Sequence, residues 1–197
     1  MNGNQRARIV DSAVLVMADA GLAGVTVRAV SAAAGVGMGT LRHYFPTQRE
    51  LHAAVVQHTM DATIDDFAIH DTSLDPGERL VRCVLQFLPV DASDGPVLEV
   101  WFGLYRHAFE PGGNSMARAF LELTVKRSHE RIRAWLEQLA DEGAVARDRI
   151  DESVLLLGAL VSGTCLEIIT PGSAMTVDAG RALLSRTSRA LIEEEKT

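Results

Sequence analysis

The chain has 197 residues, of which 47% are hydrophobic, 23% charged and 5% aromatic. This composition is typical of a globular protein of one or two domains and excludes a disordered or collagen-like chain. The two cysteines give no disulfide framework, and the first residues lack a secretory signal pattern, so we expect a cytoplasmic protein. The longest apolar run, residues 154–169, is too short and too polar to predict a membrane span.

The charge is distributed unevenly along the chain. The net charge is −7, but residues 1–52 carry +2 and the remainder carries −9. A small basic end on an acidic body indicates that the N-terminal end meets an anion.

Apolar residues recur at helical spacing and alternating strand patterns are absent, so we expect an all-α fold. Gly21 ends the first helix, and Thr26 is a candidate N-cap of the second. Thr47 and Glu50 form a capping box at the start of the fourth helix. These first four predicted helices cover about residues 9–20, 27–34, 38–44 and 48–70.

The second half of the chain is also predicted to be helical. Asp75 followed by Pro76 begins a helix whose apolar face extends to Leu88. Turn or loop residues fill 91–96 and 110–114. The later predicted helices cover about residues 97–109, 120–139, 154–169 and 177–191.

The last two helices predict a dimer. Residues 154–169 are apolar nearly all round, which predicts burial on more than one side. Residues 177–191 carry a seam at alternating spacings of three and four. Such a pair favours a homodimer through a four-helix bundle, and packing within one protomer is the alternative. The candidate interface residues are Leu160, Val177, Leu184, Thr187 and Leu191.

Residues 27–34 and 38–44, joined by a glycine turn, predict a helix-turn-helix. The second helix must enter a major groove about 12 Å wide, so it needs a small polar face opposite a buried anchor. Leu41 and Phe45 can form the anchor, and Arg42 can contact a phosphate or read guanine. The candidate contacts to double-stranded DNA are Thr26, Arg28, Gly37, Met38, Gly39, Thr40, Arg42, His43, Tyr44, Thr47 and Gln48.

Residues 26–51 resemble the DNA-binding signature of the TetR family of bacterial repressors, and residues 6–21 are similar to that family's first helix. The resemblance implies an all-helical homodimer of about nine helices that represses transcription and is released by a small-molecule inducer. It implies an operator-binding domain over residues 1–47 and a ligand-binding and dimerisation domain over residues 48–197.

Three positions depart from the family pattern. Serine or threonine is usual where Gly37 stands, tyrosine where Arg42 stands, and lysine where Gln48 stands. Glutamine can hydrogen-bond a phosphate but adds no charge. We therefore expect operator binding that is less salt-dependent than is usual for the family.

The C-terminal half resembles, less specifically, the subgroup that includes the choline-responsive repressor of betaine synthesis. We do not transfer choline, because it would need an aromatic cage and the sequence has one dense aromatic helix. The candidate ligand-binding residues are Trp101, Phe102, Tyr105, Arg106, Phe109, Phe120, Cys165 and Glu167.

Other chemistries have weaker support. The glycines of residues 35–39 follow a helix and precede no lysine, unlike a phosphate-binding loop. His58, Asp61 and Asp65 would share a helix face, where a solvated surface is favoured over a metal site. No hydrolase or dinucleotide motif is present, so we expect no enzyme activity, cofactor or metal. The alternative function is a helical scaffold that binds a small molecule or protein without an operator.

Overall fold

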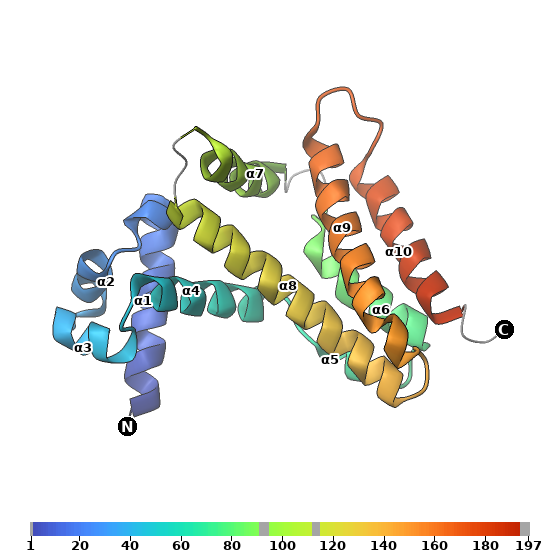
Figure 1. The fold of residues 1–197 in the computed structure, drawn as a ribbon, viewed down its shortest axis with the longest axis horizontal. Helices are drawn as coiled ribbons and strands as arrows, with labels where there is room; N and C mark the ends of the chain where they lie inside the picture. The colour runs from blue at the N-terminus through green and yellow to red at the C-terminus, as the bar shows by residue number, and fades with distance from the viewer. Residues whose placement is uncertain (1, 91–94, 112–114, 194–197) are drawn as a thin grey trace. The chain divides into compact units, whose positions relative to one another are not determined.

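The computed structural model describes residues 2–90, 95–111 and 115–193, and in these ranges it is helical and contains no strand. This confirms the all-α prediction (Figure 1). The described ranges contain ten α-helices, one more than the nine predicted from the pattern. They are α1 (Asn2–Gly24), α2 (Val27–Ala34), α3 (Met38–Tyr44), α4 (Gln48–Thr63), α5 (Phe67–His70), α6 (Pro76–Val84), α7 (Gly95–Phe109), α8 (Ser115–Asp141), α9 (Ile150–Ile169) and α10 (Val177–Glu193).

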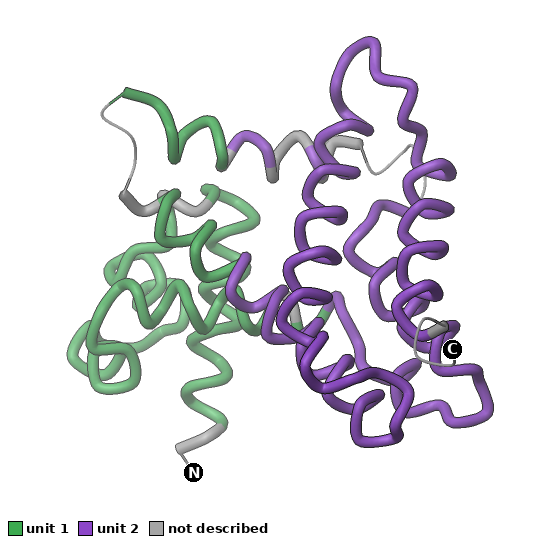
Figure 2. Tube along the Cα trace, turned by 45° about the vertical axis from the view of Figure 1, so that its right-hand side comes forward, with its two compact units in different colours: residues 1–62, 105–124 green, residues 63–104, 125–197 purple. Residues whose placement is uncertain are grey.

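The chain divides into two compact units (Figure 2). The first contains residues 1–62 and 105–124, and the second contains residues 63–104 and 125–197. The first unit takes in most of α4, because Leu51 and Val55 of that helix belong to the same buried cluster as α1 to α3. The predicted boundary at residue 47 divides the chain by function and remains a prediction.

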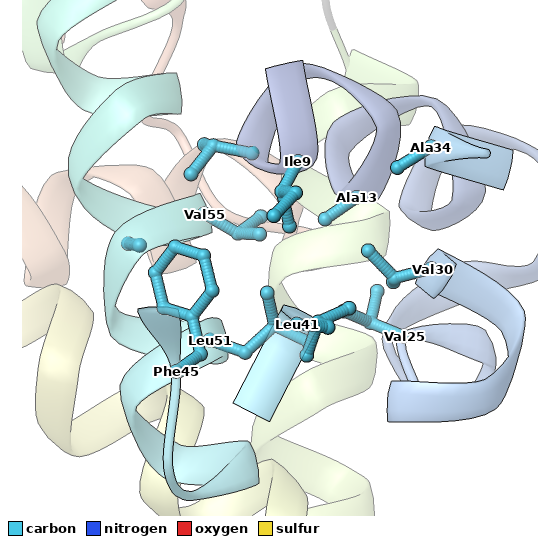
Figure 3. Packing of buried hydrophobic residues seen from close by; sticks show 11 residues of the cluster. Ile9, Ala13, Val25, Val30, Ala34, Leu41, Phe45, Leu51 and Val55 are labelled. Atoms are coloured by element: carbon cyan, nitrogen blue, oxygen red, sulfur yellow. The ribbon is translucent and has the colours of Figure 1, made fainter. Parts of the chain in front are cut away.

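The first unit has one apolar core (Figure 3). Ile9 and Ala13 of α1, Val30 of α2 and Leu41 of α3 meet there with almost no exposed surface. Phe45, directly after α3, is 1% exposed in the same cluster. Burial of this apolar surface is the main favourable contribution to the stability of the unit.

The predicted helix over residues 48–70 is interrupted. α4 ends at Thr63, and the four-residue α5 begins at Phe67. Between them, Asp66 accepts hydrogen bonds from Trp135 Nε1 at 2.6 Å and from Arg131 Nη2 at 3.1 Å. These two α8 side chains give the non-helical segment specific partners, which the helical spacing of residues 48–70 did not reveal.

The break also removes the geometry of the metal alternative. His58 and Asp61 lie on α4, whereas Asp65 lies beyond its last residue. His58 instead pairs with Asp11 of α1, with 3.5 Å between Nε2 and Oδ1. Within the described ranges, no group of three His, Cys, Asp or Glu side chains could hold a metal ion.

α6 begins as predicted, because Asp75 Oδ1 accepts a hydrogen bond from the Gly77 amide at 2.8 Å and Pro76 is the first helical residue. The α-helix ends at Val84, and a short 3₁₀ turn over Leu85–Phe87 follows it. The predicted apolar face is therefore shared between a helix and a tighter turn. The turns predicted at 91–96 and 110–114 fall largely outside the described residues.

Within the second unit, α10 packs against α6 and α9. Val177, Leu184 and Leu191, which form most of the predicted dimer seam, are at most 9% exposed within one protomer. Their apolar surface is used inside the chain, as in the second alternative given by the sequence. Thr187 and Leu160 are half-buried and remain candidate contacts.

The outward face of α9, unlike the seam of α10, has exposed apolar side chains. The side chains of Leu155, Leu156 and Leu166 are 64%, 44% and 47% exposed. The prediction that this helix is buried on more than one side is therefore not met within one protomer. An exposed leucine stripe on a helix indicates a surface that another molecule covers.

One helical stretch in the described part of the chain, Arg147–Ile169, is long and apolar enough to cross a membrane by length and composition. It is longer than the run predicted from the sequence because it includes α9 and the turn before it. A core helix passes the same test. Here 33% of the apolar window is buried, including Val154, Leu157 and Cys165 of α9.

Candidate nucleic-acid interface

Two capping interactions define α2. Thr26 is its N-cap, and the hydroxyl oxygen accepts a hydrogen bond from the Ala29 amide at 3.1 Å. Gly35 ends the helix with φ of 63°, a left-handed conformation that favours glycine. The chain then turns into α3 within three residues, as the glycine pattern predicted.

α3 has two faces of opposite character. Leu41 is fully buried within it, and Phe45 follows it into the core. The side chains of Met38, Thr40 and Arg42 are exposed on the other side. The buried face fixes the helix on the unit and leaves the second face available for a duplex.

Most of the predicted DNA contacts lie on the surface, and Thr26 and Tyr44 are half-buried. The His43 and Tyr44 rings meet edge to face, with centroids 5.2 Å apart. The exposed members of the predicted set are Arg28, Gly37, Met38, Gly39, Thr40, Arg42, His43 and Thr47.

The glycines at the start of α3 are not required by packing. A Cβ atom at Gly39 would meet nothing within 4 Å, and one at Gly37 would meet only the Thr40 hydroxyl, at 3.9 Å. Gly37 is the N-cap of α3 but provides no side-chain hydrogen bond. The bare backbone therefore leaves room for another molecule to approach closely.

The N-cap half of the predicted capping box is present at α4, while the Glu50 carboxylate accepts from the Thr47 hydroxyl in place of the Thr47 amide. The Glu50 amide donates to the Thr47 hydroxyl at 3.2 Å, and that hydroxyl donates to the Glu50 carboxylate at 3.1 Å. Gln48 does not point outward as a phosphate contact would. Its side-chain amide donates to the Val25 carbonyl oxygen at 3.1 Å, inside the first unit.

Sequence reasoning missed two residues of this region. His52 is 3% exposed, and its Nε2 lies 2.9 Å from the same Val25 oxygen. Its position four residues after Gln48 on the same helix was an available signal. Arg6 of α1 lies over the Phe45 ring, with its guanidinium carbon 5.1 Å from the centroid, and adds a cation close to α3.

The predicted ligand residues of α7 and α8 are exposed or half-buried where the structure describes their side chains. Phe109 is 71% exposed, stacks on Tyr105 and lies under the Arg118 guanidinium. Arg106 is exposed, and Phe102 and Phe120 are half-buried. The side chain of Trp101 lies outside the described residues.

The remaining two candidates lie on α9. Glu167 is exposed and accepts a hydrogen bond from the Ser173 hydroxyl at 2.6 Å. Cys165 is buried near the Phe87 carbonyl, and burial raises the pKa of its thiol to about 11. Burial likewise raises the pKa of Cys83 to about 12, so both thiols are protonated at neutral pH.

A short exposed helix, anchored by its opposite face and preceded by a capped helix and a glycine turn, defines the helix-turn-helix class of DNA-binding domains. Comparison with known proteins gives the same class. Residues 9–55 match the model described as bacterial regulatory proteins of the tetR family. Residues 76–193 match the model described as the C-terminal part of BetI-type transcriptional repressors.

Individual relatives agree with these matches. The chain is 33% identical to the HTH-type transcriptional regulator PksA of Bacillus subtilis, over 53% of this chain and 51% of that protein. The chain thus spans about half the length of that relative. It is 21% identical to the regulator BetI of Paraburkholderia xenovorans, over 81% of each chain.

Solved structures share the fold. A TetR-family transcriptional regulator from Rhodococcus sp. has a TM-score of 0.65 at 19% identity, over 96% of this chain and 99% of that one. A transcriptional regulator from Saccharomonospora viridis in complex with choline has a TM-score of 0.54 at 21% identity, over 94% and 95%.

The chain belongs to the TetR family of bacterial regulatory proteins and has a C-terminal part of the BetI type. It is a DNA-binding transcriptional regulator, as the resemblance of residues 26–51 implied.

Proposed function

We propose that this regulator is a cytoplasmic homodimeric repressor that binds a near-palindromic operator and is released by a small molecule. The observation that carries operator binding is the division of α3 into a buried face with Leu41 and an exposed face with Thr40 and Arg42. Two such helices in one dimer would enter major grooves about 34–36 Å apart, one helical turn of DNA.

The exposed side chains suit complementary roles. The Arg42 guanidinium can bind guanine through two hydrogen bonds or pair with a phosphate, and the Thr40 methyl group can contact thymine. Met38 is 57% exposed, and its apolar side chain suits a thymine methyl group as well. Arg28 at the start of α2 is placed for a phosphate contact.

The outward face of α9 supports the dimer. Leu155, Leu156 and Leu166 offer a second copy an apolar stripe, and Ala159 lies exposed between them. Leu160 and Thr187 can contribute at the edges, whereas the fully buried Leu184 acts inside the protomer. This arrangement keeps the predicted helix pair as the interface but changes which residues face the partner.

The effector would favour one dimer state over another, since a ligand shifts an equilibrium only by its differential affinity for the two states. We assign the effector to the C-terminal part of the chain and do not assign choline. Choline is bound by aromatic faces on several sides. Tyr105 and Phe109 form one stacked pair, with ring centroids 6.4 Å apart, which by itself does not make such a cage.

A mobility-shift assay on the DNA upstream of the protein's own gene tests operator binding. The assay is run at fixed salt and with excess competitor. Arg42→Ala should then weaken the specific binding free energy by about 1–3 kcal/mol if Arg42 reads a base. Arg82→Ala is the matched control, because it removes an equal charge from an exposed arginine on α6 that pairs with Glu78. Equal shifts for both variants would remove Arg42 from the interface.

If the upstream fragment gives no specific shift, selection of bound fragments from the whole genome follows. Recovery of a shared near-palindrome would support the proposal at another locus. Recovery of no specific fragment would contradict operator binding and favour the alternative of a helical scaffold that binds a small molecule or protein.

A further inference from the structure

Two side chains of α4 bind one backbone oxygen. The Gln48 amide nitrogen lies 3.1 Å from the Val25 carbonyl oxygen, and His52 Nε2 lies 2.9 Å from it. A carbonyl oxygen accepts two hydrogen bonds and donates none, so His52 must carry its proton on Nε2. Gln48 and His52 are one helical turn apart, which directs both side chains to the same point.

The position of Val25 gives this pair of hydrogen bonds its importance. Val25 precedes Thr26, the N-cap of α2, and the first carbonyl bonded within α2 is that of Thr26, which accepts from the Val30 amide at 2.9 Å. The Val25 oxygen therefore lies outside the α2 hydrogen-bond ladder. The Val25 residue is fully buried, so this carbonyl oxygen needs hydrogen-bond donors from elsewhere in the protein.

The two hydrogen bonds connect the helix-turn-helix to a rigid support. α4 is anchored in the unit's core by Leu51 and Val55, which are fully buried. Apolar contacts of that kind resist separation but allow small rotations, whereas hydrogen bonds fix direction. The Val25 oxygen thus sets how the start of α2, and with it Arg28, is oriented on α4.

We propose that Gln48 and His52 are positioning residues for operator recognition, which hold the start of α2 through the Val25 carbonyl so that α2 and α3 present one fixed surface. This inference rests on the proposed operator binding. It also assigns Gln48 a role inside the protein in place of the phosphate contact expected from the sequence.

The first test uses a duplex selected by the unaltered protein from a random-sequence DNA pool. His52→Leu replaces the imidazole donor by an apolar side chain of similar size, and should lower affinity for that duplex roughly tenfold. His52→Gln retains a donor at a similar reach and should bind within about twofold of the unaltered protein.

Val56→Ala is the control for a purely structural effect. Val56 is 2% exposed on α4 and takes no part in the Val25 hydrogen bonds, so its truncation lowers stability without altering them. All proteins are compared at a temperature well below their unfolding midpoints. If His52→Leu binds as well as Val56→Ala, or if His52→Gln fails to restore affinity while remaining folded, the positioning role is overturned.

A measurement without DNA separates this inference from the proposed function. The ¹⁵N spectrum of the histidine rings in the free protein should show His52 protonated on Nε2, and that signal should disappear in His52→Leu. A proton on Nδ1 alone would overturn the hydrogen bond and the proposed role. If the unaltered protein selects no duplex while the Nε2 proton is present, operator binding fails and only the local hydrogen bond stands.

Discussion

The predicted contact residues are exposed in one region of the molecule and mostly buried in another. The first region is the helix-turn-helix of α2 and α3, and the second is the C-terminal pair of α9 and α10. In α3 the residues expected to meet a partner, among them Thr40 and Arg42, are exposed. In α10 the residues expected to meet a partner, Val177, Leu184 and Leu191, are buried in the protomer.

The difference has a chemical cause. A surface that binds DNA has small, polar and basic side chains, so its composition distinguishes it from a protein core. A helix seam that binds a second copy has the same apolar residues as a seam that packs inside the chain. Spacing identified the apolar face of α10 but could not say which neighbour covers it.

The same substitution on α9 and α10 tests this comparison with the largest expected effect. Leu184→Ala removes a fully buried side chain and should lower the free energy of unfolding by about 2–5 kcal/mol. Leu155→Ala, at a side chain 64% exposed, should change protomer stability by about 0.5 kcal/mol or less and weaken dimerisation instead.

Urea unfolding and sedimentation at several concentrations measure the two quantities for both variants. A dimer that weakens in Leu184→Ala but not in Leu155→Ala, with unfolding unchanged, would return α10 to the role predicted from its spacing. The opposite pattern would show that α9 supplies the apolar contact between protomers.

The predictability of the molecule follows the range of its interactions. Capping at Thr26 and Thr47 is local, so the N-caps of α2 and α4 could be predicted from neighbouring residues. The end of α4 depends on Asp66 binding two side chains of α8, more than 60 residues away in the chain. No local pattern contains that information.

The candidate site shows the same limit. The exposed face of α3 followed from helical spacing opposite Leu41. The inward direction of Gln48 depends on where the Val25 carbonyl lies, which is set by tertiary packing. Glu167 was a candidate ligand residue, but its carboxylate is on the surface beside Ser173.

Glu142→Gln tests a contact in the second unit that the sequence did not indicate. The Arg79 side chain is 2% exposed and donates both to Glu142 and to the Ile69 carbonyl, at 2.8 Å to the latter. Glu142 itself is exposed, so solvent screens the pair, and replacing its carboxylate by a neutral amide beside the buried guanidinium should cost about 1–2 kcal/mol in chemical unfolding. A change near zero would show that water compensates this charge.

The same ion pair predicts an acid sensitivity. Hydrogen bonds from Arg79, and then from Gln138, hold the pKa of Glu142 below its ordinary value of 4.5. The unfolded chain therefore binds this proton more readily, so the stabilisation is complete above pH 4.5 and is lost as pH falls through the lower, folded pKa. Unfolding followed against pH should show a shallower acid limb in Glu142→Gln, and an identical limb would contradict the assignment.

Gly39→Ala separates stability from DNA binding in the first unit. A Cβ atom there meets nothing within 4 Å, and alanine favours a helix over glycine, so stability should rise by as much as about 0.5–1 kcal/mol. If the bare backbone lies against the duplex, operator affinity should fall about tenfold, or 1.4 kcal/mol. Higher stability with undiminished affinity would place this turn of α3 away from the DNA.

The smallest expected effects come from single substitutions at the two N-caps of the helix-turn-helix. Gly37 has φ of −68° and ψ of 148°, a conformation that serine adopts readily, and a Cβ atom there would be at ordinary contact distance from Thr40. Gly37→Ser should therefore supply the missing N-cap hydrogen bond and stabilise the unit by a few tenths of a kcal/mol. Thr26→Gly should remove the existing bond to the Ala29 amide at a similar cost.

Hydrogen exchange of the amides at the start of α2 and α3 resolves effects of this size. Protection should increase in α3 for Gly37→Ser and decrease in α2 for Thr26→Gly, with the other helix unchanged in each case. Changes in both helices for either variant would mean that the helix-turn-helix opens as one cooperative unit. In that event the cap of one helix would set the stability of both, and the fixed surface of α3 would depend on Thr26 as much as on its own first turn.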